Sequence, residues 1–294
     1  MKPDTVTSTM EKSKQDLFLN RWLTPKWLIE GSLNDDVWKV QLKDPELSRS
    51  DPVYLRFNVP ILPGPILLTD EGNESDLITV KIIIISSVSL IGGTTNSNYV
   101  CQALLRDLLQ FIRWKRSEGI DRNSDLTEQW FDRYVQLLRK GGVSGLLPLK
   151  ERISELLQGL QSGAISLPIT SDGRGVAMDS LAKLIGLNRR RQVPAHLWAQ
   201  VLKYLREEHS HLSLRNVAGC AKAERANSSS EKTRASLQVW KMLWIYRDKL
   251  AHDPLSFNPF IFQKCNTVAR SIERPTAATT PLPPSHQTLY IINS

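Results

Sequence analysis

The densest run of positive charge in the chain lies between Gly186 and Pro194. A helix, a glycine-containing turn and a second helix opened by proline are typical of a helix-turn-helix, whose second helix meets base edges and phosphates. This pattern predicts DNA contact by the run itself, with Lys183 and Lys203 adding contacts to the phosphate backbone. A solvated turn of a helical hairpin has the same composition, so that alternative stays open. The run consists of Arg189, Arg190 and Arg191.

A second basic group lies near the ends of two helices that the spacing predicts over about 99–118 and 127–140. Side chains at such positions can grip phosphates. Acidic residues at positions 107, 118, 121 and 132 alternate with them, however, and an ordinary solvated helix face has the same pattern. We expect DNA contacts from Arg113, Lys115, Arg116, Arg139 and Lys140.

The net charge is unevenly distributed along the chain. The 294 residues have 38 Lys plus Arg and 30 Asp plus Glu, a balance of +8. The first hundred residues hold 10 basic and 13 acidic side chains, a balance of −3, so the remaining 194 carry +11. Such an asymmetry of charge is typical of proteins that bind a polyanion. A well-solvated basic surface explains it equally well, so both interpretations stay open.

Patterns for catalysis and for metal or cofactor binding are absent from the sequence. There is no phosphate-cradling glycine motif, and GGVSGL at Gly141 lacks the spacing of a nucleophile elbow. None of the five histidines falls in a zinc-ligand spacing, and the aspartates are scattered. We therefore expect no catalytic residue, no metal, no cofactor and no small-molecule substrate. The histidines are His196, His209, His211, His252 and His286.

Three widely spaced cysteines, without a CxxC pair, are consistent with a reduced chain in the cytoplasm. The N-terminal 16 residues contain six charged side chains and no apolar stretch of the kind found in secretory signals. The longest apolar run, within 77–90, is too short for a membrane-spanning helix, which needs about 20 residues. We expect no membrane association.

The periodicity predicts a mainly helical protein with a small mixed N-terminal unit. Alternation from Val53 to Val59 predicts a half-buried strand, and the Ile- and Val-rich stretch from Leu77 to Leu90 predicts a second, more buried one. Helical spacing also indicates a short helix over 16–22 and further helices over about 149–160, 179–185, 194–205 and 231–250. The expected units are a mixed α+β unit (1–92), a helical hairpin (93–145), a helix-turn-helix-like segment (146–215), a loop with a long helix (216–274), and a Pro- and Thr-rich linker that ends in the start of a helix (275–294).

The 96–143 stretch resembles the core-binding region of tyrosine recombinases of the phage-integrase type. In that family a helix with an "F..W....G" pattern precedes a helix with an "lT......Y...L" pattern. The matching positions here are Phe111, Trp114, Gly119, Leu126, Thr127, Tyr134 and Leu138. The segment HDPLSFNPF at 252–260 and the C-terminal SHQTLYIINS also resemble the passage into the catalytic domain of mobile-element integrases. The resemblance implies a SAM-like helical clamp on duplex DNA, with other recombinase protomers as further partners.

The catalytic domain that the resemblance would require is missing from this sequence. The family uses a tyrosine nucleophile together with arginine and an HxxR cluster, which stabilise charge on the attacked phosphate. No histidine here is followed by arginine at the third position, so Tyr290 is not expected to be a nucleophile.

The sequence therefore predicts the DNA-binding portion of a site-specific recombinase, cut before its catalytic domain and inactive alone in strand cleavage. A self-contained DNA-binding transcriptional regulator is the first alternative. A protein-interaction module with an incidental basic surface is the second.

Overall fold

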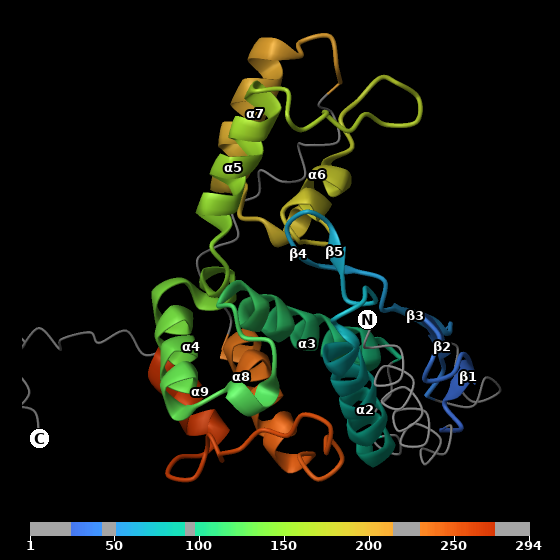
Figure 1. Ribbon diagram of the computed structural model, residues 1–294, viewed down its shortest axis with the longest axis vertical. Helices are drawn as coiled ribbons and strands as arrows, with labels where there is room; N and C mark the ends of the chain where they lie inside the picture. The colour runs from blue at the N-terminus through green and yellow to red at the C-terminus, as the bar shows by residue number, and fades with distance from the viewer. Residues whose placement is uncertain (1–24, 43–50, 92–97, 214–229, 274–294) are drawn as a thin grey trace, which may run out of the picture.

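The computed structural model describes residues 25–42, 51–91, 98–213 and 230–273, which form two lobes stacked along the long axis of the molecule (Figure 1). The basal lobe contains residues 25–147 and 230–273 of this set. The three-helix lobe contains residues 149–213. The chain thus leaves the basal lobe, builds the second lobe and returns. The helix expected over 16–22 and the linker expected over 275–294 lie outside the described residues.

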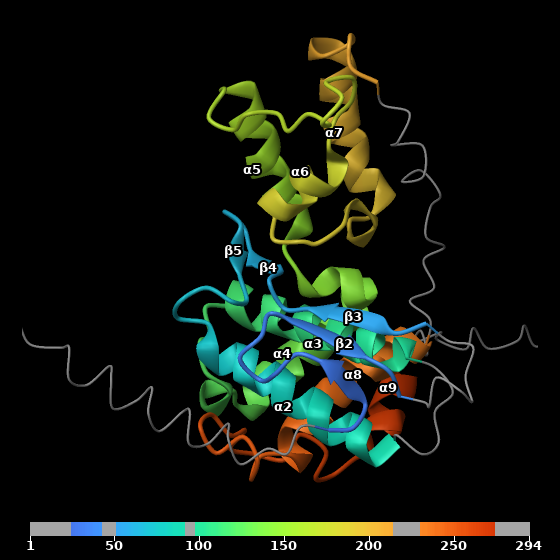
Figure 2. The same ribbon diagram turned by 90° about the vertical axis from the view of Figure 1, so that its right-hand side faces the viewer.

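A small antiparallel sheet covers one side of the basal lobe (Figure 2). Trp38, Val40 and Leu55 lie on its buried face. The predicted alternation of buried and exposed side chains from Val53 to Val59 is confirmed, although the strand itself ends at Arg56. The strands pair in the order β1-β2-β3: β1 is Leu28–Glu30, β2 is Val37–Val40 and β3 is Val53–Arg56.

The strand predicted over Leu77 to Leu90 is wrong, because this stretch lies within the 18-residue helix α2, Glu74–Ile91. Residues 78 to 88 of α2 are buried around the whole circumference of the helix, so their sequence lacks a polar face. A helix of this kind reads as a continuous apolar run, as a buried strand does. Length separates the two readings, since strands rarely exceed ten residues. Glu74 and Asp76 in the first turn also favour a helix start.

Several polar side chains in the interior part of α2 are buried and hydrogen-bonded to other elements. Lys81 Nζ donates to the carbonyl oxygens of Leu33 (2.6 Å) and Asp35 (3.0 Å) and lies over the Phe57 ring. Burial lowers the pKa of Lys81 to about 8. These contacts attach the loop between β1 and β2 to the helix. No helix in the described part of the chain is long and apolar enough to cross a membrane.

An aromatic cluster forms the centre of the basal lobe. Trp114 lies 4.6 Å from Tyr134 between ring centroids, and Trp240 lies 5.3 Å from Phe111. The two helices predicted over about 99–118 and 127–140 are confirmed as α3 and α4. The helix predicted over 231–250 is confirmed as α8, which ends at residue 245 and is followed by turns. The sequence reading missed α9. The helices are α3 (Tyr99–Ser117), α4 (Glu128–Gly141), α8 (Ser230–Ile245) and α9 (Cys265–Glu273), with short 3₁₀ helices η1 (Asn123–Asp125) and η2 (Gly142–Leu146).

The three-helix lobe has α5 packed against α7, with α6 beside them (Figures 1 and 2). The expected helices in this region are confirmed, as is a mainly helical fold with a small sheet. Gly186 makes the turn after α6 with a φ of +80°. The elements are α5 (Leu149–Gln161), α6 (Met178–Leu184), η3 (Arg190–Gln192) and α7 (Ala195–Glu208).

A two-stranded hairpin of the basal lobe, β4 (Pro60–Leu62) with β5 (Ile66–Leu67), reaches the three-helix lobe (Figures 1 and 2). The Gly64 amide donates to the Leu184 carbonyl at 3.3 Å. The Leu62 carbonyl carbon lies so close to Gly186 that a Cβ there would be 2.8 Å away. Backbone against backbone at this distance requires glycine. This contact and the bond between Gly64 and Leu184 join the two lobes.

We expect Gly186→Ala to destabilise the protein more than Gly163→Ala does. Both glycines have left-handed φ values, but a Cβ at Gly163 would meet nothing within 4 Å. The shared conformational strain costs about 1–2 kcal/mol. The forced backbone shift at Gly186 adds about 1–3 kcal/mol. Urea unfolding measures the difference, and equal losses in the two variants would show that the junction yields freely.

Candidate nucleic-acid interface

Two of the basic residues predicted to contact DNA are interior residues. Arg113 and Lys115 of α3 are 1% and 0% exposed. Arg113 donates through Nε (3.1 Å) and Nη2 (2.8 Å) to the Pro60 carbonyl, so it ties α3 to β4. Burial, helped by the nearby Arg152 guanidinium, lowers the pKa of Arg113 to about 10, and it stays charged at neutral pH. The prediction of DNA contact by these two residues is wrong, because neither side chain reaches solvent.

The third predicted contact in α3, Arg116, belongs to the same interior network. Asp76 of α2 accepts from Lys115 Nζ at 2.5 Å and from Arg116 Nε at 2.7 Å, and its side chain is 1% exposed. Arg116 also pairs with Asp121, and its own side chain is only 10% exposed. Its charge is already matched by two carboxylates, so we withdraw the prediction for Arg116 as well.

The other predicted pair on the hairpin, Arg139 and Lys140, is exposed at the C-terminal end of α4. Cations are stabilised there by the helix dipole. No carboxylate in the described part of the chain pairs with either side chain. The following 3₁₀ helix, η2, leads directly to the three-helix lobe, so this pair lies where the two lobes join.

The arginine run is held by an ordered turn that leaves two of its side chains in solvent. Gln192 Oε1 accepts from the amides of Asn188 (2.8 Å) and Arg189 (3.1 Å). Asp179 in the first turn of α6 accepts from the Arg190 amide at 2.9 Å. The indole of Trp198 in α7 donates to the Arg190 carbonyl at 2.8 Å.

These bonds join the backbone of the run to side chains of other residues. Arg189 and Arg191 are exposed, and Arg190 is half-buried. Lys183 on the preceding helix α6 is exposed too. The turn therefore concentrates positive charge on one segment of the three-helix lobe, just before α7 begins.

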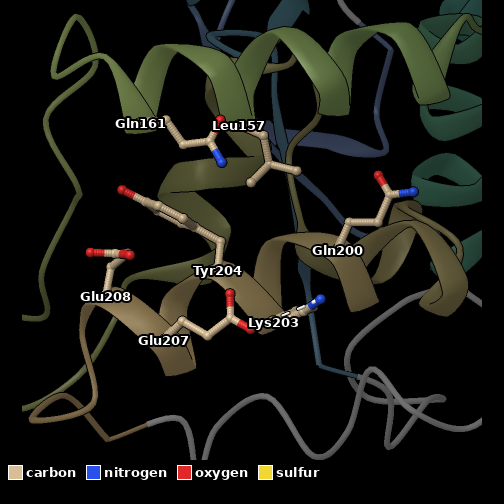
Figure 3. A pocket seen from close by; sticks show the side chains of 7 residues that line it. All are labelled: Leu157, Gln161, Gln200, Lys203, Tyr204, Glu207 and Glu208. Atoms are coloured by element: carbon tan, nitrogen blue, oxygen red, sulfur yellow. Dashed lines mark ion pairs between the residues drawn. The ribbon is translucent and has the colours of Figure 1, made fainter.

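The remaining predicted contact, Lys203 of α7, lies in a groove between α5 and α7 with acidic neighbours (Figure 3). Its Nζ is 3.9 Å from Glu207 Oε1, and Glu208 follows along the same edge. The groove of about 500 Å³ thus has more negative than positive charge. Phosphate is disfavoured there, so we withdraw the prediction for Lys203.

A cavity of about 220 Å³ between the lobes was not found by sequence reasoning. It has three basic side chains, Arg106, Arg191 and Lys232, and one carboxylate, Asp107, which is 3.0 Å from Arg106 Nε. Burial raises the pKa of Asp107, although the Arg106 bond opposes the rise. The other lining residues are Gln110, Val143, Ser144, Leu147, Leu149, Leu187, Gln192 and Ser236. They come from five separate elements and the loops between them, so no sequence motif joins them.

A partly buried Ser–His–Asp group at the start of α2 lacks the geometry of a catalytic triad. The Ser75 hydroxyl donates to Asp253 at 3.2 Å rather than to His252. The His252 Nε2 instead lies 3.2 Å from Thr79 Oγ1 and 3.2 Å from the Ser75 carbonyl, and burial lowers the pKa of His252. Asp253 also accepts from the Asn123 amide at 2.7 Å. A triad needs the imidazole to accept the proton of the nucleophilic hydroxyl, so this group fastens η1 to α2 instead.

Comparison with models of protein families, with curated proteins and with solved structures gives no match for this chain.

We expect Lys115→Met to destabilise the fold by about 3 kcal/mol, the lower end for breaking a buried ion pair, because Asp76 loses one of its two cations and keeps Arg116. The carbonyl of Asp121 and the side chain of Asn123 also lose a donor, at 3.0 and 3.3 Å. Lys140→Met, at the exposed end of α4, serves as the control and should change stability by less than about 0.5 kcal/mol. Chemical denaturation compares them. A small effect of both changes would mean that the interior network contributes little.

Proposed function

We propose that this chain binds duplex DNA through a basic surface made by the arginine turn and the end of α4. The observation that carries the proposal is the ordered turn before α7, whose backbone is fixed by side chains of other residues while Arg189 and Arg191 remain in solvent. A fixed backbone limits the entropy that this segment loses when its arginines bind phosphates. With the interior and acid-paired residues removed, six predicted contacts remain: Arg139, Lys140, Lys183, Arg189, Arg190 and Arg191.

We further propose that the chain is the DNA-binding part of a tyrosine-recombinase-like integrase. The residues that resemble that family lie on two successive helices, α3 and α4, and Phe111, Trp114 and Tyr134 pack together in the aromatic cluster. Gly119 ends the first helix with a φ of +74°, and Thr127 precedes the second. These residues have structural roles, so the recombinase assignment rests on their spacing and the DNA-binding proposal rests on the exposed cations.

A protein-interaction module is the second candidate, favoured by one apolar feature. Phe262 and Ile261, in the loop before α9, are 91% and 64% exposed. Adjacent exposed apolar side chains of this size are a feature of partner-binding surfaces. Salt dependence separates the two functions, since apolar docking responds weakly to ionic strength whereas phosphate binding responds steeply.

We expect binding to a duplex to weaken with salt along a log–log slope of about −5, as six phosphate contacts require. Changing Arg189, Arg190 and Arg191 together to alanine should reduce the steepness by about 2–3 units. Fluorescence anisotropy with a labelled duplex at several salt concentrations measures both values.

The matched control changes Lys150, Lys203 and Arg206 to alanine, which removes the same charge from exposed positions of the same lobe. That variant should keep the wild-type slope if contact is local. Equal flattening by both triple variants would show a general effect of net charge. A wild-type slope near zero would contradict DNA binding and favour the interaction module.

A further inference from the structure

We propose that the cavity between the lobes binds one nucleotide unit of the nucleic acid, with its phosphate held by Arg106 and Arg191. This inference rests on the proposed function and names the part of the ligand that the cavity takes. It also adds a residue, Arg106, that lies far from the arginine turn in the sequence.

The charge of the cavity suits a phosphate group. Arg106 comes from α3 of the basal lobe and Arg191 from η3 of the three-helix lobe, and Lys232 of α8 is a third cation. Asp107 neutralises part of this charge through its bond to Arg106, which leaves the lining with a formal balance of +2. An anion between two guanidinium groups from opposite lobes would be bound by charge-assisted hydrogen bonds.

The walls of the cavity suit the sugar of a nucleotide rather than a bare anion. Four aliphatic side chains form an apolar part of the lining: Val143, Leu147, Leu149 and Leu187. Pockets for organic ligands combine such walls with a few polar groups that fix orientation. Inorganic phosphate would leave this apolar surface uncovered, whereas a nucleotide would cover it with the carbon atoms of its sugar.

The polar part of the lining is fixed by bonds to other residues. Ser236 is 5% exposed, and its Oγ lies 2.8 Å from the hydroxyl of the fully buried Tyr134. Gln110 Nε2 donates to the Val143 carbonyl at 3.3 Å, which ties α3 to η2. Gln192 uses its Oε1 for two backbone amides, which leaves its N–H groups as donors. A pre-formed lining of this kind limits the entropy lost on binding.

The volume limits the enclosed part of a nucleotide to its phosphate and sugar. The cavity of 220 Å³ corresponds to roughly seven water molecules at their share of liquid volume. That is below the range of about 300–1,000 Å³ for pockets that enclose drug-sized ligands. A phosphate with its sugar fits this space, and a longer strand would have to continue along the surface outside.

Calorimetric titration of the whole chain with thymidine 5′-monophosphate, inorganic phosphate and thymidine tests the proposal. We expect the monophosphate to bind more tightly than either of the others. Arg106→Gln and Arg191→Gln should each weaken it by about tenfold or more, the usual loss for a hydrogen bond to a charged group. Arg174→Gln, an exposed change in the three-helix lobe outside the cavity, should have no effect. Equal binding by all three variants would overturn the proposal.

A second variant changes the cavity without changing its charge. Val143→Trp, at a half-buried wall position, should fill the space and abolish binding of the monophosphate while far-ultraviolet circular dichroism stays unchanged. Unaltered monophosphate binding by this variant would overturn the cavity assignment. Equal affinity for inorganic phosphate and the monophosphate would overturn the nucleotide assignment.

Duplex titration separates failure of this inference from failure of the proposed function. A slope near −5 with no monophosphate binding would overturn the cavity and leave DNA binding intact. A slope near zero with cavity-dependent monophosphate binding would overturn duplex binding and support a nucleotide site.

Discussion

The carboxylate of Asp76 holds the two central helices of the basal lobe together. It lies in the interior between Lys115 and Arg116, so α2 and α3 are joined by two hydrogen-bonded ion pairs. Removing such charges from water costs several kcal/mol per ion, and only good geometry with further hydrogen bonds offsets this. Lys115 meets that condition through Asp121 and Asn123. The position of α3, and hence of the aromatic cluster and of Arg106, depends on this group.

Buried arginines act in a similar way at the junction of the lobes, with backbone carbonyls as acceptors. Arg113 of α3 binds the Pro60 carbonyl in β4, and Arg152 of α5 binds the Ile185 carbonyl at 3.0 Å. Together with the contact between Gly186 and Leu62, these bonds fix the hairpin between the lobes. The cavity with Arg106 and Arg191 exists only because the lobes meet in this arrangement, so its geometry follows from interior bonds outside it.

The sequence pattern predicted amphipathic helices correctly, but it did not predict a helix that is buried on every side. The spacing of Leu, Trp and Phe located α3, α4, α5 and α7, since each has one apolar face and one polar face. It misread α2, because a helix buried on every side has no polar face to show the helical period. It placed the arginine turn correctly at the start of α7, since Gly186 and Pro194 are strong local signals.

The candidate site was harder to predict, because whether a basic residue is available depends on contacts between distant segments. Arg113, Lys115 and Arg116 lie next to one another near the end of an amphipathic helix and read as a phosphate-binding group. Their acceptors, Pro60 and Asp76, are about 40 to 50 residues earlier in the chain, and no local pattern joins them. The cavity has the same property, with lining residues from 106 to 236.

Net charge is therefore a poor measure of how strongly this surface attracts a polyanion. Residues 101–294 carry a net charge of +11. Some of their basic side chains are buried, however, where Lys115 pairs with Asp76 and Arg113 binds a backbone carbonyl. Interior cations still contribute to the long-range field, yet they release no counterions from a bound phosphate backbone. The salt dependence of binding counts contacts, whereas steering over longer distances follows the total charge. For this chain the number of phosphate contacts is smaller than the net charge suggests. Three of the ten basic residues that the sequence predicts as DNA contacts stabilise the interior instead.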